Sequence, residues 1–136
     1  DGDLVRAATH VAFSARGLAE FSGIEDVEAG LRSVHQQVEK WCCVTLGADG
    51  LLVIEEGRLH HLPAFEVKVS DTLGAGDVWH GAFALALAEG QATSDAVTFA
   101  SAAAALKVRN GSGRAGCATR GDVEEFLLQQ VTESPT

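Results

Sequence analysis

Asp71 and Asp77 enclose a turn of small residues, Gly74, Ala75 and Gly76, and an apolar helix-like run follows directly. Such a turn leaves backbone N–H groups unpaired at the start of a helix, where the helix dipole also favours negative charge. The stretch therefore predicts an anion site. A carboxylate beside a bound anion is electrostatically unfavourable, so its presence there suggests a chemical role. Removing a proton next to a phosphoryl group is such a role. Capping of the helix by Asp77 is the simpler alternative, and the spacing alone does not separate the two.

A second glycine turn, from Gly47 to Gly50, follows the apolar run 41–46, which is typical of a strand buried on both faces. The turn has neither a Walker lysine nor the three-glycine dinucleotide pattern, so by itself it indicates only a structural turn. Ligands of parallel α/β sheets bind at the carboxyl ends of strands. Because both glycine turns are expected at such ends, we predict that they line one cleft.

The elements that would position these turns alternate between strand and helix patterns. This alternation predicts an α/β class with a largely parallel sheet and helices on both faces. The expected strands are residues 10–13 and 41–46, a hairpin of 51–54 and 59–62, and a further extended piece at 67–70.

Helical spacing and capping residues predict five helices. They are expected at 14–21 with Ser14 as N-cap, at 24–38, at 78–88, at 93–106 with Thr93 or Ser94 as N-cap, and after Thr119 with Asp122 as the acid of a capping box. A helical pattern at 4–8, a glycine-rich loop at 110–116 and a frayed tail from residue 132 complete the expectation.

The composition suits one globular domain over residues 1–136 and argues against some partners. A net charge of -9 disfavours nucleic acid and anionic membranes, since both attract basic surfaces. There is no apolar run of the ~20 residues that a membrane span needs. Cys42, Cys43 and Cys117 show no metal-binding spacing, which predicts small buried residues in a reducing cytoplasm. The start at Asp1 has no Met or targeting character and is typical of the interior of a longer protein.

Asp71 to Asp77, with the sequence DTLGAGD, resembles the D-T-x-G-A-G-D signature of the ribokinase-like (PfkB) carbohydrate kinases at every specified position. Thr45 to Gly50, with the sequence TLGADG, resembles the family's T-x-G-x-x-G nucleotide segment, and Thr119 opens what looks like its closing helix. The resemblance covers essentially the whole chain but only the C-terminal half of the family's fold. It implies a three-layer ribokinase-like fold with a mostly parallel central sheet, without the N-terminal half and its lid.

The resemblance also implies a reaction, the ATP-dependent phosphorylation of a sugar hydroxyl. Asp77 would be the general base, and the backbone at Gly74, Ala75 and Gly76, with the N–H of Asp77, would form the anion hole. The phosphates and ribose of ATP would lie along Thr45, Leu46, Gly47, Ala48, Asp49 and Gly50, with Ser101 facing the base. Asp71 and the carbonyl of Leu73 would bind K+, together with part of the 109–116 loop.

One segment departs from the family pattern. Ribokinases carry an N-x-x-E motif that organises Mg2+ through water, whereas the matching segment here is Ser14-Ala15-Arg16-Gly17. This departure favours a divergent sugar or ketose kinase. The sequence leaves two interpretations open for three cationic residues, either contacts to phosphate or solvated charges at the end of a helix: Lys107, Arg109 and Arg114. No function is expected for His60, His61 or His80, and Trp79 is expected in the core.

Other functions remain compatible with these motifs. One is a nucleoside kinase of the same family, and another is a nucleotide- or sugar-sensing protein that keeps the fold without turnover. The expected partner is a small sugar, and a homodimer is one arrangement open to the complete protein. Isolated, this piece is expected to expose apolar surface and to self-associate.

Overall fold

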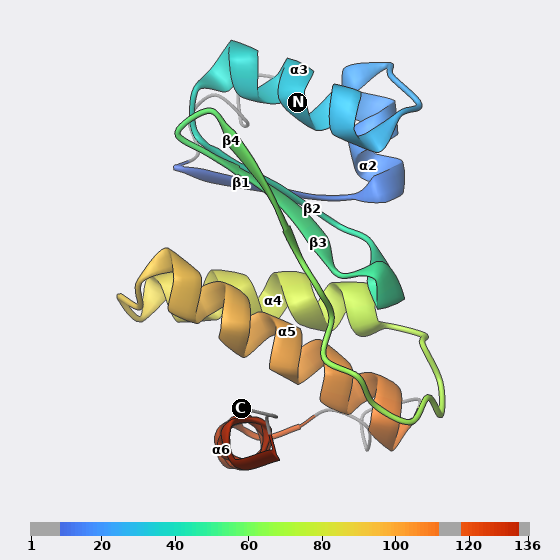
Figure 1. The fold of residues 1–136 in the computed structure, drawn as a ribbon, viewed down its shortest axis with the longest axis vertical. Coiled ribbons are helices and arrows are strands. Elements are labelled where there is room, and N and C mark those ends of the chain that lie inside the picture. Colours follow the sequence, from blue (N-terminus) through green and yellow to red (C-terminus); the bar gives the residue numbers. More distant parts are fainter. Residues whose placement is uncertain (1–8, 112–117, 134–136) are drawn as a thin grey trace. The chain divides into compact units, whose positions relative to one another are not determined.

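The chain divides into a strand-rich first unit, Asp1–Ala64, and a helical second unit, Phe65–Thr136. This computed structural model describes residues 9–111 and 118–133 (Figure 1). Within those residues no helix is long and apolar enough to cross a membrane. The prediction of a single domain over residues 1–136 stays a prediction.

The sheet of the first unit contains four strands in the order β1 (His10–Ser14), β2 (Trp41–Thr45), β3 (Leu51–Glu55) and β4 (Arg58–Leu62). β1 and β2 pair in parallel, whereas the β2–β3 and β3–β4 pairs are antiparallel. The expectation of a mostly parallel sheet is therefore wrong for the described strands. The reason is the length of the connections, because a few residues can link only antiparallel neighbours.

Two helices, α2 (Ala15–Ser22) and α3 (Val27–Val38), pack on this sheet. The predicted cap of the first is confirmed, since the Ser14 hydroxyl accepts a hydrogen bond from the Gly17 N–H at 3.0 Å. The second begins three residues later than predicted. Its cap is Asp26, whose carboxylate accepts from the Ala29 N–H at 2.9 Å, so the expected first turn lies outside the helix.

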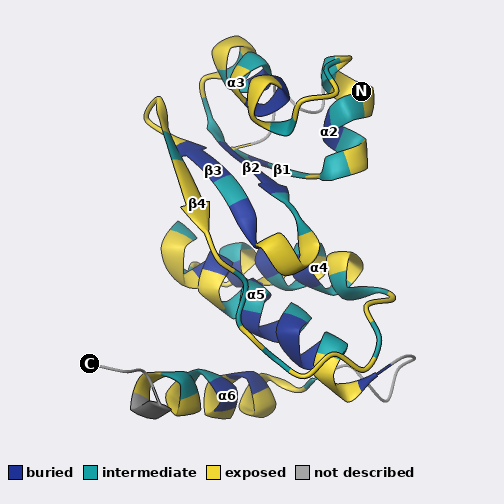
Figure 2. Cartoon of the chain, turned by 45° about the vertical axis from the view of Figure 1, so that its right-hand side comes forward, coloured by how far each residue is buried: buried dark blue, intermediate teal, exposed yellow. Residues whose placement is uncertain are grey.

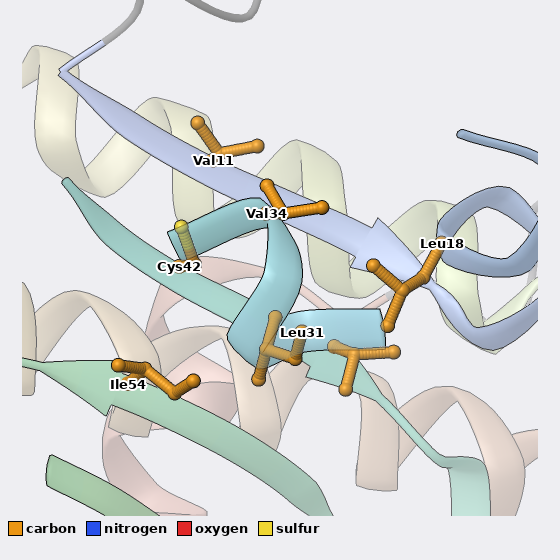
Figure 3. Close-up of a cluster of buried hydrophobic side chains, with 7 residues drawn as sticks. Val11, Leu18, Leu31, Val34, Cys42 and Ile54 are labelled. Atoms are coloured by element: carbon orange, nitrogen blue, oxygen red, sulfur yellow. The ribbon is translucent and has the colours of Figure 1, made fainter. Parts of the chain in front are cut away.

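The first unit has its own hydrophobic core, which Figure 3 shows. Its buried members come from β1, the two helices, β2 and β3: Val11, Leu18, Leu31, Val34, Cys42, Val44 and Ile54. Figure 2 shows the contrast between the buried central strands and the exposed edge strand β4. The side chains of β2 are buried at three successive positions, which confirms the prediction of a strand covered on both faces.

Cys42 and Cys43 are both buried and free of disulfides. Burial raises the pKa of the Cys42 thiol to about 11. Burial, with a smaller effect of Cys42, also raises the pKa of Cys43. Both thiols are protonated and unreactive at neutral pH, as expected for structural residues. Cys117 lies outside the described residues.

The second unit contains α4 (Ala75–Ala88), α5 (Thr93–Asn110) and α6 (Arg120–Glu133). The first two lie side by side, and the buried residues of α5 are mostly alanines, which permit a close approach (Figure 1). α4 begins three residues earlier than predicted, so Asp77 lies inside its first turn. The predicted caps of α5 are wrong, because Ala92 holds the N-cap position and no side chain caps it.

The predicted capping box of α6 is confirmed. The Thr119 N–H donates to the Asp122 carboxylate at 3.0 Å, and the Asp122 N–H donates to the Thr119 hydroxyl at 3.2 Å. The next residue, Arg120, donates to both carboxylate oxygens of Glu89 at 2.7 Å and lies over the ring of Phe99. These contacts connect the start of α6 to the end of α4 and to α5.

The extended piece expected at 67–70 forms no strand. Its end is instead held by α5, because the N–H groups of Ser70 and Asp71 donate to the Val108 carbonyl at 2.9 and 3.1 Å. Val67 packs on the core of the second unit while Val69 is 62% exposed. The β-branched residues at 67–70 therefore do not add a strand to the sheet in the described part of the chain.

Among the described glycines of the first unit, Gly50 leaves the least room for a side chain. Its φ is +86°, and an added Cβ would lie 2.0 Å from the Leu62 carbonyl oxygen. We expect Gly50→Ala to lower the free energy of unfolding by about 3 kcal/mol or more, measured by chemical denaturation. Gly57→Ala is the matched control, since φ is +80° there but the space is open. It should cost about 1–2 kcal/mol, and equal losses in the two variants would contradict the steric explanation.

We expect Asp122 to make a pH-dependent contribution to stability. Its pKa is lowered, mainly because the carboxylate accepts the hydrogen bond from the Thr119 N–H, with smaller effects of the Thr119 hydroxyl and Arg109. A folded pKa below the unfolded value of about 4 means that the contribution is present above pH 4 and is lost as the pH falls through the folded pKa. Asp122→Asn should therefore destabilise the protein at pH 7, and thermal melts of the two proteins should converge in acid. A pH-independent difference would exclude this origin.

Candidate active site

The turn before α4 is shaped by the side chain of Asp71. Its carboxylate accepts a hydrogen bond from the Leu73 N–H at 2.9 Å, and its own N–H is held by Val108 at the end of α5. Leu73 is 71% exposed, so this turn is not fixed by burial of its apolar residue. Local hydrogen bonds and the end of α5 therefore determine the path of the chain into the helix.

Gly74 is the N-cap of α4 and adopts the left-handed conformation, with φ +81° and ψ -1°. Its carbonyl accepts from the Val78 N–H at 3.0 Å, and the Thr72 carbonyl accepts from the Ala75 N–H at 3.2 Å. No described residue accepts a hydrogen bond from the N–H groups of Gly74, Gly76 or Asp77. These three donors are therefore available to an external anion, whereas the N–H of Ala75 is already engaged.

The chain contains an internal comparison for Asp77. Asp77 and Asp122 both occupy the third position of a helix, the position at which an acid can bond back to the N-cap. Asp122 makes that bond to Thr119. The exposed carboxylate of Asp77 accepts no hydrogen bond from any described residue. The geometry therefore does not support a capping role for Asp77, and its carboxylate is available to a ligand.

The first turns of α4 also contain Trp79 and His80. Trp79 is buried, stacks on Phe83 with ring centroids 5.0 Å apart, and donates from Nε1 to the Ser101 hydroxyl at 3.2 Å. The prediction of Trp79 as a core residue is confirmed. His80 Nδ1 lies 2.9 Å from the carbonyl oxygen of Gly76, which makes this nitrogen the protonated one.

The second predicted set, Thr45 to Gly50, lies in the first unit at the carboxyl end of β2. Residues Gly47–Asp49 form a single 3-10 turn. The N–H groups of Leu46, Asp49 and Gly50 are used within this turn, while no described residue accepts from those of Gly47 and Ala48. The exposed backbone at Gly47 and Ala48 is the part of the turn that can meet a ligand.

One residue that holds this turn was missed from the sequence. His61 Nε2 lies 2.7 Å from the Asp49 carbonyl, so the edge strand β4 is bonded to the turn after β2. Only the antiparallel register of β3 and β4 brings these residues together. A histidine in a hairpin gives no signal of this contact.

The cationic residues at the end of α5 differ from one another. Lys107 is 5% exposed, which corrects the interpretation of a solvated charge. Arg109 is exposed and lies 5.7 Å from the centroid of the Phe126 ring. Arg114 and most of the 110–116 loop lie outside the described residues.

Residues 2–120 match the family model described as pfkB family carbohydrate kinase. The chain belongs to this family. It is 40% identical over 84 residues to ribokinase from Bacillus subtilis (strain 168), which covers 62% of the chain and 29% of that enzyme. The PfkB resemblance inferred from the two motifs is thereby confirmed.

Solved structures confirm a ribokinase-like α/β fold. Ribokinase from Thermotoga maritima superposes with a TM-score of 0.82 at 32% identity, over 94% of this chain and 45% of that one. Ribokinase from Arabidopsis thaliana, complexed with ribose and ATP, gives 0.79 at 25% identity, over 93% and 43%. The chain thus spans less than half the length of each of these relatives.

The segment that departs from the pfkB pattern has a structural role in the described fold. The Ser14 hydroxyl is used as the cap of α2, and an added Cβ at Gly17 would lie 3.0 Å from that oxygen. Neither residue offers a carboxylate, and the described residues hold no group of three His, Cys, Asp or Glu that suits a metal. The segment therefore does not fit the role of organising Mg2+.

The predicted site residues fall into two groups. Asp71, Leu73 and the 74–77 turn form one continuous structure in the second unit, where Ser101 is bonded to the start of α4 through Trp79. The nucleotide segment 45–50 belongs to the first unit. The shared cleft of the two glycine turns remains a prediction, and one of its premises is wrong, because no strand ends before Asp71.

Proposed function

We propose that the protein containing this chain transfers the γ-phosphoryl group of ATP to a hydroxyl of a sugar. The observation that carries this proposal is the start of α4, where an unbonded carboxylate, Asp77, stands beside three N–H groups without described acceptors. The family membership adds the reaction class, and the Arabidopsis relative with ribose and ATP adds the kind of substrates.

In the proposed reaction Asp77 accepts the proton of the substrate hydroxyl as its oxygen attacks the γ-phosphorus. The bond between that phosphorus and the β–γ bridging oxygen breaks, and ADP leaves. The N–H groups of Gly74, Gly76 and Asp77 stabilise the negative charge on the oxygens of the phosphoryl group during transfer. The engaged N–H of Ala75 contributes by fixing the turn through Thr72.

The nucleotide is proposed to contact the turn from Thr45 to Gly50 through the backbone of Gly47 and Ala48. Ser101 is proposed to face the base, since its oxygen already accepts from Trp79 and its proton is free to donate. Mg2+ is expected to enter with ATP, since the segment at Ser14 has no carboxylate that could hold it.

A K+ site at Asp71 and Leu73 agrees with the chemistry of the residues present. One oxygen of the Asp71 carboxylate is used by the Leu73 N–H, and the Leu73 carbonyl accepts from no described residue. Such oxygens suit a hard monovalent cation. When bound, the ion would add positive charge beside the turn and hold Asp71 in place.

Asp77→Asn tests the general base in the complete protein. The variant cannot accept the proton, so kcat should fall by about 10²- to 10⁴-fold while calorimetric ATP binding changes little. Asp122→Asn is the matched control, because it removes the same charge from the same helical position of α6 and should retain full turnover. Near-normal kcat in Asp77→Asn would exclude this base. ATP binding without phosphorylated product from a panel of sugars and nucleosides would favour a sensing protein.

Gly76→Ala separates function from fold. Gly76 has an ordinary helical backbone and open space around an added Cβ, so the fold does not require glycine there. Alanine should raise stability by about 0.5–1 kcal/mol, since glycine is the poorer helix former. Its methyl group would obstruct the approach of a phosphoryl group to the N–H groups, so kcat should fall by about 10-fold or more. Higher stability with unchanged kcat would count against this anion hole.

A further inference from the structure

One buried charge has no role in the reaction proposed above. Lys107, in the last turn of α5, is 5% exposed and is the single buried charged side chain among residues 9–111 and 118–133. Burying an ammonium group is costly unless its hydrogen bonds and its charge are compensated. Its surroundings therefore need an explanation.

The partner of the Lys107 ammonium is a backbone group. Nζ donates to the Gly111 carbonyl at 2.8 Å, and the Gly111 N–H donates to the Lys107 carbonyl at 3.1 Å. Gly111 has φ +96° and ψ -170°, a conformation that is essentially confined to glycine. No described acid lies within ion-pair distance of Nζ, so the charge is only partly compensated, by carbonyl dipoles and by the negative end of α5.

The lysine lies directly against the anion-binding turn. Its Cε is 3.6 Å from the position that a Cβ on Gly74 would occupy. The same end of α5 holds Ser70 and Asp71 through the Val108 carbonyl. A fixed positively charged side chain therefore lies next to Gly74, the N-cap of α4, within the same unit.

We infer that Lys107 is a positioning residue for phosphoryl transfer. It acts through Gly74 and Gly111, and its buried charge raises the positive potential of the anion hole. This inference rests on the proposed function. A charge in a poorly solvated environment acts more strongly on a nearby anion than an exposed one, and it acts most where negative charge develops during the reaction.

A purely structural lysine would be an expensive choice. A neutral side chain of similar length fills the same space without desolvation, and replacing buried charges by neutral groups is often neutral or stabilising. A charged side chain next to the turn is explained if its charge stabilises an anion bound there. The two explanations differ in what a neutral variant does to kcat and to stability.

The experiment compares neutral and charged variants in the complete protein. Lys107→Gln keeps a donor for the Gly111 carbonyl and removes the charge, and Lys107→Arg keeps the charge. Lys68→Gln is the control, because it removes an exposed positive charge from the same unit. For each variant kcat, KM for ATP and the melting temperature are measured beside wild type and Asp77→Asn.

We expect Lys107→Gln to lower kcat by about 10- to 100-fold. KM for ATP should change by less than about threefold, because the interaction strengthens as charge develops. The melting temperature should be maintained, Lys107→Arg should recover most of the loss, and Lys68→Gln should match wild type.

Three outcomes would overturn the inference. The first is a kcat of Lys107→Gln equal to that of wild type, and the second is an equal loss of activity in the glutamine and arginine variants. The third is that neither Lys107→Gln nor the apolar Lys107→Met folds, which would make the lysine structural. The proposed function has its own tests. If wild type forms no phosphorylated product, the proposed function and the inference on Lys107 both fail. If Asp77→Asn remains active, only the assignment of Asp77 as the base fails.

Discussion

The absence of a side-chain cap on α4 is the constraint on which the candidate site depends. Helices usually satisfy their first N–H groups with a Ser, Thr, Asp or Asn at the N-cap, as Ser14 and Asp26 do for α2 and α3. Gly74 has no side chain to do so, and the acid at the third position makes no bond back. The donors thus remain exposed, where water satisfies them at little cost until an anion replaces it.

An open helix start is useful only if its backbone is held in place. Two sets of hydrogen bonds provide this restraint. The Asp71 carboxylate fixes the turn through the Leu73 N–H, and α5 holds Asp71 through the Val108 carbonyl. The close, alanine-rich packing of α4 on α5 makes these two helices one rigid support. Preorganised donors of this kind need little rearrangement when charge develops, which is how backbone N–H groups stabilise a phosphoryl group effectively.

The glycines of the two turns serve different physical purposes. Gly50 is required by the fold, because a Cβ there would collide with the Leu62 carbonyl in the hairpin. Glycine is favoured at position 74 because the backbone there is in the left-handed conformation. Gly76 has neither requirement, and it weakens the helix that it belongs to. A glycine that the fold does not need and that weakens its helix is consistent with the proposed approach of a phosphoryl group to this turn.

The sequence by itself determined the local features of this protein: the caps at Ser14 and Thr119, the buried strand β2, the hairpin after it, and the two motifs that place the chain in the pfkB family. These follow from neighbouring residues, because capping, periodicity and glycine turns are short-range effects. The tertiary structure decided what depends on distant residues. It left Asp77 without a hydrogen bond while Asp122 caps its helix, joined His61 to the turn at Asp49, and buried Lys107 next to Gly74. Spacing cannot predict such contacts, since each one requires the packing of elements that are far apart along the chain.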